Sequence, residues 1–216
     1  MEHLVTIGKS PDEIQKWMFE MHPELPCLHD AVRRITIPSK REVVPYQASV
    51  IYHLAKQFDK GRALEIGSAL GYSLSFICAA MPRAKKVVGL NPKDVEYEWA
   101  VTAVMIHDYA QVVALKSTSY LNDYVGAELD FIFVDGSHDH VEDDVPWFNI
   151  LRPGGLILFH DYSPADSKRP TPHVYEVVNA MQNDLGRDFD VAVIDNQGVG
   201  MVGFYRREDE TVWGGA

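Results

Sequence analysis

Two short apolar runs near the middle of the chain, each followed at once by acidic or imidazole side chains, constrain the fold most. Phe131–Val134 leads into Asp135, and Leu156–Phe159 leads into His160 and Asp161. Apolar runs of this length, rich in Ile, Val and Phe, are typical of strands buried on both faces. The segment between them starts with acidic residues and ends in Arg-Pro-Gly-Gly, which predicts a helix and then a tight return.

The two strands are expected to be parallel, because a strand–helix–strand crossover joins them. Their carboxyl ends then emerge at the same edge of the sheet, which is where open α/β sheets bind ligands. Adjacent strands lie about 4.8 Å apart, so the side chains of Asp135 and Asp161 are expected to reach one small ligand between them. The sequence therefore predicts a binding site at this edge.

The rest of the chain alternates strand and helix patterns and ends in a hairpin. We expect an α/β fold with a doubly wound, Rossmann-like sheet of seven strands, mostly parallel with an antiparallel last strand. The expected strands are 63–66, 86–90, 112–116, 131–134, 156–159, 189–195 and 200–206. The expected helices outside the central crossover are 11–21, 28–35, 45–58, 74–81, 94–110, 119–125 and 171–185.

Residues 1–44 are expected to form a helical arm or cap, because this proline-broken segment is too short to bury its own core. Residues 45–207 are expected to form the main domain and 208–216 a frayed tail. A formal net charge of −11 argues against nucleic acid or an anionic membrane as partner. Two cysteines without close spacing predict neither a disulfide framework nor a zinc ribbon. Without a signal-peptide or membrane-span pattern, a cytoplasmic protein is expected.

A turn that carries two glycines follows the first expected strand and precedes a helix. Gly67 and Gly71 come after Glu65 and are followed by Tyr72 and Ser73. Glycines allow a sharp turn and a close approach of a ligand to the main chain, and the N-terminus of the next helix suits a carboxylate or phosphate. The spacing matches neither the dinucleotide pattern G-x-G-x-x-G nor a P-loop, which argues against NAD and ATP.

These two stretches together resemble the motifs of a known enzyme class. ALEIGSALGYSLSFIC resembles the first motif of class I S-adenosylmethionine-dependent methyltransferases. FIFVDGSHDH and LRPGGLILFHDY resemble later motifs of the metal-dependent O-methyltransferases. The likeness is greatest to enzymes that act on sugar hydroxyls of macrolides and rhamnosides, and more distant to catechol O-methyltransferases. It extends from about Pro45 to Arg206, with the motifs in the same order.

The resemblance implies S-adenosylmethionine as the cofactor. It assigns the methionine moiety to five residues of the turn, with Glu65 supporting them: Gly67, Ser68, Gly71, Tyr72 and Ser73. It also places Ser117 at the adenine. In the family an acidic residue at the end of the second strand binds both ribose hydroxyls, whereas this chain has VGLN at positions 88–91. Leu90 is then expected to pack on adenine, and Asn91 to bind the ribose as a neutral substitute.

Methyl transfer to an alcohol requires its oxygen to lose a proton, and a divalent cation at that oxygen lowers its pKa. Asp135, His160 and Asp161 are the candidate ligands for magnesium or manganese. An imidazole ligand favours manganese, iron, nickel or zinc; if His160 turns into the core instead, two carboxylates and water remain. His138 is the candidate catalytic base, because its pKa lies near the operating pH. The resembling sugar O-methyltransferases carry a histidine at this position.

The predicted function is therefore that of an S-adenosylmethionine-dependent, divalent-metal-assisted O-methyltransferase. Its substrate would be a small-molecule hydroxyl of a sugar or natural product, and its N-terminal arm would cover the site or mediate homo-oligomerisation. Two alternatives stay open, a binding protein that keeps the fold without transfer activity and another metal-dependent reaction at the same site. Strand-end aspartates also often cap helices, and His140, Asp143 and Asp144 are expected to face solvent or start the next helix.

Overall fold

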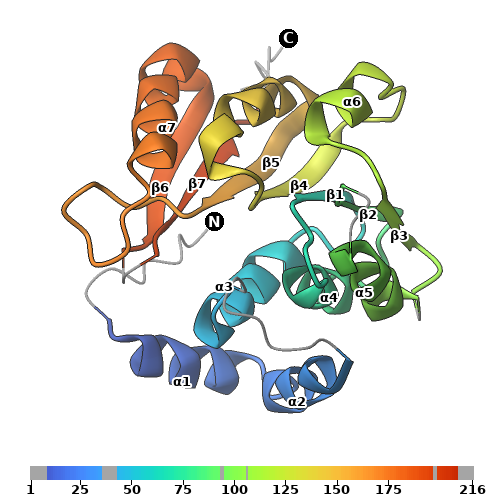
Figure 1. Ribbon diagram of the computed structural model, residues 1–216. Coiled ribbons are helices and arrows are strands. Elements are labelled where there is room, and N and C mark those ends of the chain that lie inside the picture. The colour runs from blue at the N-terminus through green and yellow to red at the C-terminus, as the bar shows by residue number, and fades with distance from the viewer. Residues whose placement is uncertain (1–8, 36–42, 93–94, 106, 197–198, 209–216) are drawn as a thin grey trace, which may run out of the picture.

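A seven-stranded sheet forms the centre of the computed structural model, which describes residues 9–35, 43–92, 95–105, 107–196 and 199–208 (Figure 1). Its strands lie in the order β3-β2-β1-β4-β5-β7-β6, and within these residues β7 alone runs opposite to the other six strands. The strands are β1 (Arg62–Ile66), β2 (Lys86–Leu90), β3 (Ala110–Val113), β4 (Leu129–Val134), β5 (Leu151–His160), β6 (Phe189–Asp195) and β7 (Met201–Arg206). The predicted α/β doubly wound sheet with an antiparallel last strand is confirmed.

Helices cover both faces of the sheet. The α-helices are α1 (Pro11–Met21), α2 (Leu25–Ile35), α3 (Pro45–Lys56), α4 (Tyr72–Ala80), α5 (Val95–Val104), α6 (Ser117–Asn122) and α7 (Pro172–Leu185), and the 3₁₀ helices are η1 (His138–Ile150) and η2 (Gly186–Asp188). In Figure 1, α3, α4 and α5 lie on one side of the sheet, and α6, η1 and α7 on the other. Phe131 and Phe133 of β4 pack into the first layer, Ile132 and Val134 into the second. Both faces of β4 are therefore buried, as its unbroken apolar run predicts.

The N-terminal arm packs outside α3 and α4 (Figure 1). Ser10 and Glu13 form a capping box that fixes the start of α1. The carboxylate of Glu24 accepts hydrogen bonds from the Tyr52 hydroxyl at 2.7 Å and from the Lys56 ammonium at 2.6 Å. No residue of α1 or α2 lines the cavity at the carboxyl edge of the sheet. These two helices therefore brace the domain, and the expected cap over the site is not formed by them.

The tight return expected at 152–155 lies inside β5. Leu129 of β4 pairs with Leu151, whereas Phe131, two residues further on, pairs with Leu156. Three extra residues of β5 are thus accommodated as an excursion within the strand. After this excursion the two strands run in regular parallel register to their carboxyl ends.

Several element boundaries and the type of one helix also differ from the sequence prediction. The helix expected over 94–110 ends at Val104, and β3 begins at Ala110 instead of residue 112. The crossover between β4 and β5 is the 3₁₀ helix η1, with a kink at His140 and Pro146 inside it. Proline removes a backbone donor and clashes with the preceding turn, so a regular α-helix is unfavourable there.

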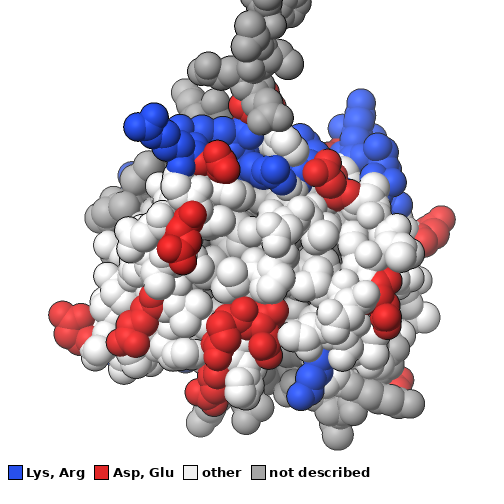
Figure 2. All heavy atoms as spheres, turned by 90° about the horizontal axis from the view of Figure 1, so that it is seen from above, with Lys and Arg blue, Asp and Glu red and all other residues white. Residues whose placement is uncertain are grey.

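Basic side chains gather along one border of the face shown in Figure 2, and acidic ones are spread over the remainder. Among the residues that the structure describes, no helix has the length and apolar character needed to cross a membrane. Of the expected frayed tail, 208–216, all but the first residue lies outside the described part of the chain.

Candidate functional site

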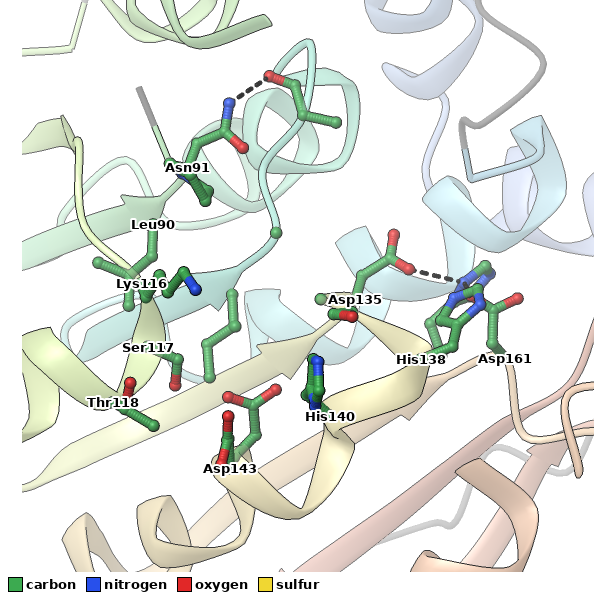
Figure 3. Close-up of a pocket in the computed structure, with 18 of the residues that line it drawn as sticks. Leu90, Asn91, Lys116, Ser117, Thr118, Asp135, His138, His140, Asp143 and Asp161 are labelled. Carbon is green, nitrogen blue, oxygen red and sulfur yellow. Dashed lines mark hydrogen bonds and ion pairs between the residues drawn. The ribbon is translucent and has the colours of Figure 1, made fainter. Parts of the chain in front are cut away.

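A cavity of about 690 Å³ lies at the carboxyl edge of the sheet, where the strand order reverses between β1 and β4 (Figure 3). Ligands of open α/β sheets bind at such an edge, and the volume is typical of small-molecule sites. Four strand ends contribute to its wall: residues 66–67 after β1, 90–91 after β2, 135–138 after β4 and 160–161 at β5. The cavity lies where the sequence predicts a binding site.

Two aspartates and two histidines, the Asp–His cluster, meet at one side of this cavity: Asp135, His138, His160 and Asp161. Figure 3 shows Asp135, His138 and Asp161 of this cluster. His138 Nε2 pairs with Asp161 Oδ2. His160 Nδ1 lies 3.1 Å from Asp135 Oδ1 and 3.2 Å from Asp161 Oδ2. One ligand atom from each of Asp135, His138 and Asp161 lies within 4.8 Å of the other two. The carboxyl ends of β4 and β5 thus bring both aspartates to one point, as expected.

The backbone of Asp161 explains why two consecutive residues reach the same point. Successive side chains of a strand face opposite sides, but Asp161 adopts φ +57° and leaves the extended conformation. Its carbonyl oxygen accepts hydrogen bonds from the Ser163 N–H at 3.0 Å and from the Thr171 hydroxyl. This left-handed conformation is uncommon, but Asp is among the residues that adopt it most easily.

Charges within the Asp–His cluster stabilise one another. Burial opposes the charged form of His160, but the carboxylates of Asp135 and Asp161 raise its pKa to about 10. Burial raises the pKa of Asp135, against the effect of His160. Burial also opposes ionisation of Asp161, yet His138 and His160 hold its pKa well below the usual range. The hydrogen bond to Asp161 raises the pKa of His138. The carboxylates are therefore arranged to hold positive charge between them.

The first part of the glycine turn, at Gly67 and Ala69, lines the adjoining wall of the cavity. Gly67 and Gly71 have φ of +88° and +81°, which glycine alone adopts without strain. A Cβ on Gly67 would lie 2.6 Å from the carbonyl carbon of Asp135 and 2.9 Å from Cα of Gly136. A Cβ on Gly71 would lie 2.9 Å from Cα of Ala100 in α5. Both glycines are therefore required for the close packing of the turn, Gly67 against the end of β4 and Gly71 against α5, as well as for its backbone conformation.

Residues 64–162 match the model of a methyltransferase domain family. Over this part of the chain, just under half of its length, the sequence is that of a methyltransferase domain. The predicted relationship to the class I methyltransferases is confirmed by this match together with the fold. No curated protein sequence matches the chain.

Several solved structures share the fold of this methyltransferase domain. The SAH-bound methyltransferase PaMTH1 of Podospora anserina has a TM-score of 0.71 at 17% identity, with 96% of this chain and 100% of that chain covered. An O-methyltransferase of Bacillus cereus in complex with SAH has a TM-score of 0.65 at 17% identity, with 89% of this chain and 97% of that chain covered. The O-methyltransferase TomG of Streptomyces achromogenes is involved in tomaymycin synthesis and was solved with SAM. It has a TM-score of 0.63 at 20% identity, with 94% of this chain and 93% of that chain covered.

Four of the residues expected to bind the cofactor line the cavity: Gly67, Leu90, Asn91 and Ser117. The side chain of Tyr72 points elsewhere, because its hydroxyl lies 3.1 Å from Nδ1 of the buried His29 in the arm. The Tyr72 hydroxyl is thus bonded to the arm, and the role of Tyr72 at the cofactor stays a prediction. Glu65, Ser68, Gly71 and Ser73 are likewise absent from the cavity wall. The side chains of Glu65, Ser68 and Ser73 are buried, and the roles of these residues at the cofactor stay predictions.

Gly89 and Asn91, at the end of β2, lie in different surroundings. A Cβ on Gly89 would overlap the Ser68 hydroxyl and lie 2.6 Å from Cδ2 of Leu74, so this glycine is required for packing under α4. Asn91, the first residue after β2, lines the cavity and donates from Nδ2 to the Ala69 carbonyl at 3.3 Å. Asn91, and not Gly89, therefore lines the cavity at the end of β2.

Glu65 is completely buried beneath the glycine turn. The hydroxyls of Ser68 and Ser73 lie near its carboxylate without forming a well-directed hydrogen bond within the described residues. Burial raises the pKa of Glu65 to about 8, against the effect of these hydroxyls. An unpaired buried carboxylate prefers its neutral form.

This raised pKa predicts a pH-dependent stability. Between the unfolded pKa near 4.5 and the folded pKa of about 8, the native state binds one proton more than the unfolded chain. The contribution of Glu65 to stability is then complete below pH 4.5 and decreases by about 1.4 kcal/mol per pH unit up to pH 8. We expect this decline to disappear in Glu65→Gln, as measured by urea unfolding at pH 5, 6, 7 and 8. Equal slopes in both proteins would contradict it.

Several residues of the cavity were not predicted from the sequence: Gln47, Lys116, His140, Asp143, Asp144 and Arg169. Asp144, expected to start a helix at the surface, is buried, and burial raises its pKa to about 6, with Ser117 opposing the rise. Ser117 also accepts a hydrogen bond from Trp147 Nε1 at 2.7 Å. A pair of acidic residues before a proline gives no signal of such burial, because the folding of η1 over the cavity decides it.

The donor atoms of the Asp–His cluster suit a divalent cation. Carboxylate oxygens from Asp135 and Asp161 converge with His160 Nδ1, while His160 Nε2 faces Gln47 Oε1 at 3.1 Å. A ligating histidine is typically held in this way, with its second ring nitrogen hydrogen-bonded to an acceptor. The mixed oxygen and nitrogen set suits manganese, iron, nickel or zinc better than magnesium. His160 does not turn away into the core.

Proposed function

We propose that this protein is an S-adenosylmethionine-dependent O-methyltransferase whose acceptor hydroxyl is activated at the Asp–His cluster. The observation that carries the proposal is the placement of this cluster and the glycine turn on adjoining walls of one cavity. The proposal is supported by O-methyltransferases of the same fold that bind SAM or SAH. It also accounts for the carboxylates that hold positive charge on the acceptor side.

The cofactor would lie across the ends of β1, β2 and β3. Its methionine end would approach Gly67 and the N-terminus of α4, where the positive end of the helix dipole favours a carboxylate. Its adenosine would extend toward Leu90 and Ser117, which line the far part of the cavity. Asn91 would bind the ribose through a neutral amide in place of a carboxylate.

A divalent cation held by Asp135, His160 and Asp161 would lower the pKa of the acceptor hydroxyl. His138 would remove the proton. Its side chain is 49% exposed, and Nε2 pairs with Asp161. No described residue bonds to Nδ1 of His138, which leaves this nitrogen to receive the proton. Asp161 would orient the ring and stabilise the imidazolium that forms, as its raising of the His138 pKa indicates.

The acceptor would be a small hydroxylated molecule, such as a sugar or another natural product. The cavity of about 690 Å³ would hold the cofactor together with a compact acceptor. A role in natural-product chemistry is supported by the fold shared with TomG, which is involved in tomaymycin synthesis. The chain also provides Arg169 at the cavity wall, a cation that could contact polar groups of the acceptor.

Calorimetric titration with S-adenosylmethionine tests the proposal directly. We expect binding in the micromolar range or tighter, measured with and without manganese or magnesium. A fold-sharing binding protein without transfer activity would bind the cofactor but transfer no methyl group from labelled S-adenosylmethionine to a panel of sugar and phenolic alcohols. Absence of cofactor binding under every metal condition would overturn the proposal.

The role of His138 is tested by His138→Gln. We expect turnover to fall by about 10²–10⁴-fold, the contribution of a general base, while manganese affinity changes little. Methyl transfer and calorimetric manganese titration are measured on the same preparation. If manganese binding is lost together with turnover, His138 is a metal ligand and the base must be sought elsewhere.

A further inference from the structure

Gln47 of α3 contacts the Asp–His cluster from outside through its amide. The side chain of Gln47 is almost completely buried, as are Asp195 at the end of β6 and His160 at the end of β5. Gln47 Oε1 lies 3.1 Å from His160 Nε2. Gln47 Nε2 donates to Asp195 Oδ2 at 2.9 Å and to the Val199 carbonyl at 2.5 Å. All three polar contacts of one amide are thus made inside the protein.

The chemistry of these partners fixes the orientation of the amide. A carboxylate and a carbonyl accept hydrogen bonds and do not donate them, so both must face the NH₂ group of Gln47. Oε1 therefore faces His160 and requires a donor, which makes Nε2 the protonated ring nitrogen of His160. The other ring nitrogen, Nδ1, then faces Asp135 and Asp161, at 3.1 and 3.2 Å. The carboxylates hold a second proton on Nδ1 in the charged ring. A cation bound there would release that proton to solvent, and Gln47 in α3 would keep the remaining proton on Nε2.

The two groups that accept from the Gln47 amide, the Asp195 carboxylate and the Val199 carbonyl, lie in segments that are themselves hydrogen-bonded to other parts of the site. Asp195 Oδ2 also accepts from the Tyr46 hydroxyl at 2.7 Å, so two consecutive residues of α3 bind one carboxylate. Beyond Val199, Gly200 accepts from the Tyr162 N–H at 3.0 Å and donates to Ser163 Oγ at 3.1 Å. The segment before β7 that carries Val199 and Gly200 is therefore hydrogen-bonded directly to Tyr162 and Ser163, which follow Asp161.

We propose that Gln47, held by Asp195, is a positioning residue that orients His160 as a nitrogen ligand and so gives the cluster its preference for manganese-type cations over magnesium. This inference rests on the proposed function, because it requires the cluster to bind a cation. Nitrogen donors contribute little to magnesium binding, which depends on the oxygen ligands Asp135 and Asp161. Disturbing Gln47 should therefore weaken manganese binding much more than magnesium binding.

The test compares wild type, Gln47→Met and Tyr46→Phe in calorimetric titrations of the full chain with manganese and with magnesium. Met keeps the length of the side chain but removes the amide. Tyr46→Phe is the matched control, because it removes a hydrogen bond to the same Asp195 from the same helix without touching His160. We expect the manganese affinity of Gln47→Met to fall about 10–100-fold and its magnesium affinity to change less than threefold. In Tyr46→Phe we expect both affinities to change less than threefold.

Nitrogen-15 spectra of histidine-labelled protein give a readout that does not depend on the cation or on activity. We expect the His160 signal, assigned by its loss in His160→Gln, to show that Nε2 keeps its proton when the wild-type ring becomes neutral at high pH, and to show a mixture of the two neutral tautomers in Gln47→Met. Unchanged manganese affinity in Gln47→Met would overturn the inference, as would equal losses in Tyr46→Phe. Wild type that binds neither cation would instead overturn the metal part of the proposed function.

Discussion

Asp161→Asn is expected to abolish metal-dependent methyl transfer while S-adenosylmethionine binding stays within about threefold of wild type. The substitution removes the negative charge that pairs with His138 and lies 3.2 Å from His160 Nδ1. Loss of an outer-shell partner of a metal ligand costs about 10–100-fold in affinity, so loss of a ligand should exceed that range. Calorimetry with manganese and a methyl-transfer assay measure the two effects.

The choice of asparagine follows from the backbone. Asp161 has φ +57°, a conformation that Asn adopts easily and Ala does not. Asp161→Ala would therefore combine loss of the ligand with strain. Asp143→Asn is the matched control, because Asp143 lines the same cavity but lies outside the Asp–His cluster. Unchanged turnover in Asp161→Asn, or an equal loss in Asp143→Asn, would remove the metal role of Asp161.

Gly67→Ala is expected to destabilise the fold and to disrupt the cavity together. The added Cβ would have to adopt φ +88° and would lie 2.6 Å from the carbonyl carbon of Asp135. Backbone strain of about 1–3 kcal/mol adds to a steric overlap of about 1–3 kcal/mol. The overlap is with backbone atoms, which cannot move away without displacing Asp135. Urea unfolding measures the stability loss, and calorimetry the loss of both cofactor and manganese binding.

Gly186→Ala separates strain from overlap. Gly186 also has positive φ, +58°, but a Cβ there would meet nothing within 4 Å. We expect backbone strain alone to lower the free energy of unfolding of this variant, by about 1–3 kcal/mol. Cofactor and manganese binding should be unchanged. If Gly67→Ala is no more destabilised than Gly186→Ala and keeps its ligand affinity, the turn does not depend on its contact with β4.

The strands that enclose the site were predictable from the sequence because they are buried on both faces. Phe131–Val134 needs no amphipathic period, since both layers of helices pack against it. The hairpin of β6 and β7 was likewise predicted from two apolar runs and a turn. Helix ends were harder: the helix expected to reach residue 110 ends at Val104. There the apolar pattern continues from α5 into β3, and propensity alone does not mark the change.

The direction of individual side chains was less predictable than the position of the elements. Tyr72 follows the glycine turn, as in the motif, yet its hydroxyl binds His29, 43 residues earlier in the chain. Asp144 belongs to an acidic stretch and is nevertheless buried. In both cases the partner comes from a distant segment whose packing does not appear in the local pattern.

The sequence by itself determined the sheet, the edge at which its ligands bind, and the meeting of Asp135 with Asp161, because strand ends and parallel crossovers follow from local patterns. Only the tertiary structure decided how His160 is used. Its ring is oriented by Gln47, 113 residues away in the chain, through an amide that Asp195 and Val199 hold in turn. Hydrogen-bond direction is a property of three-dimensional packing, so no spacing of residues along the chain could have specified it.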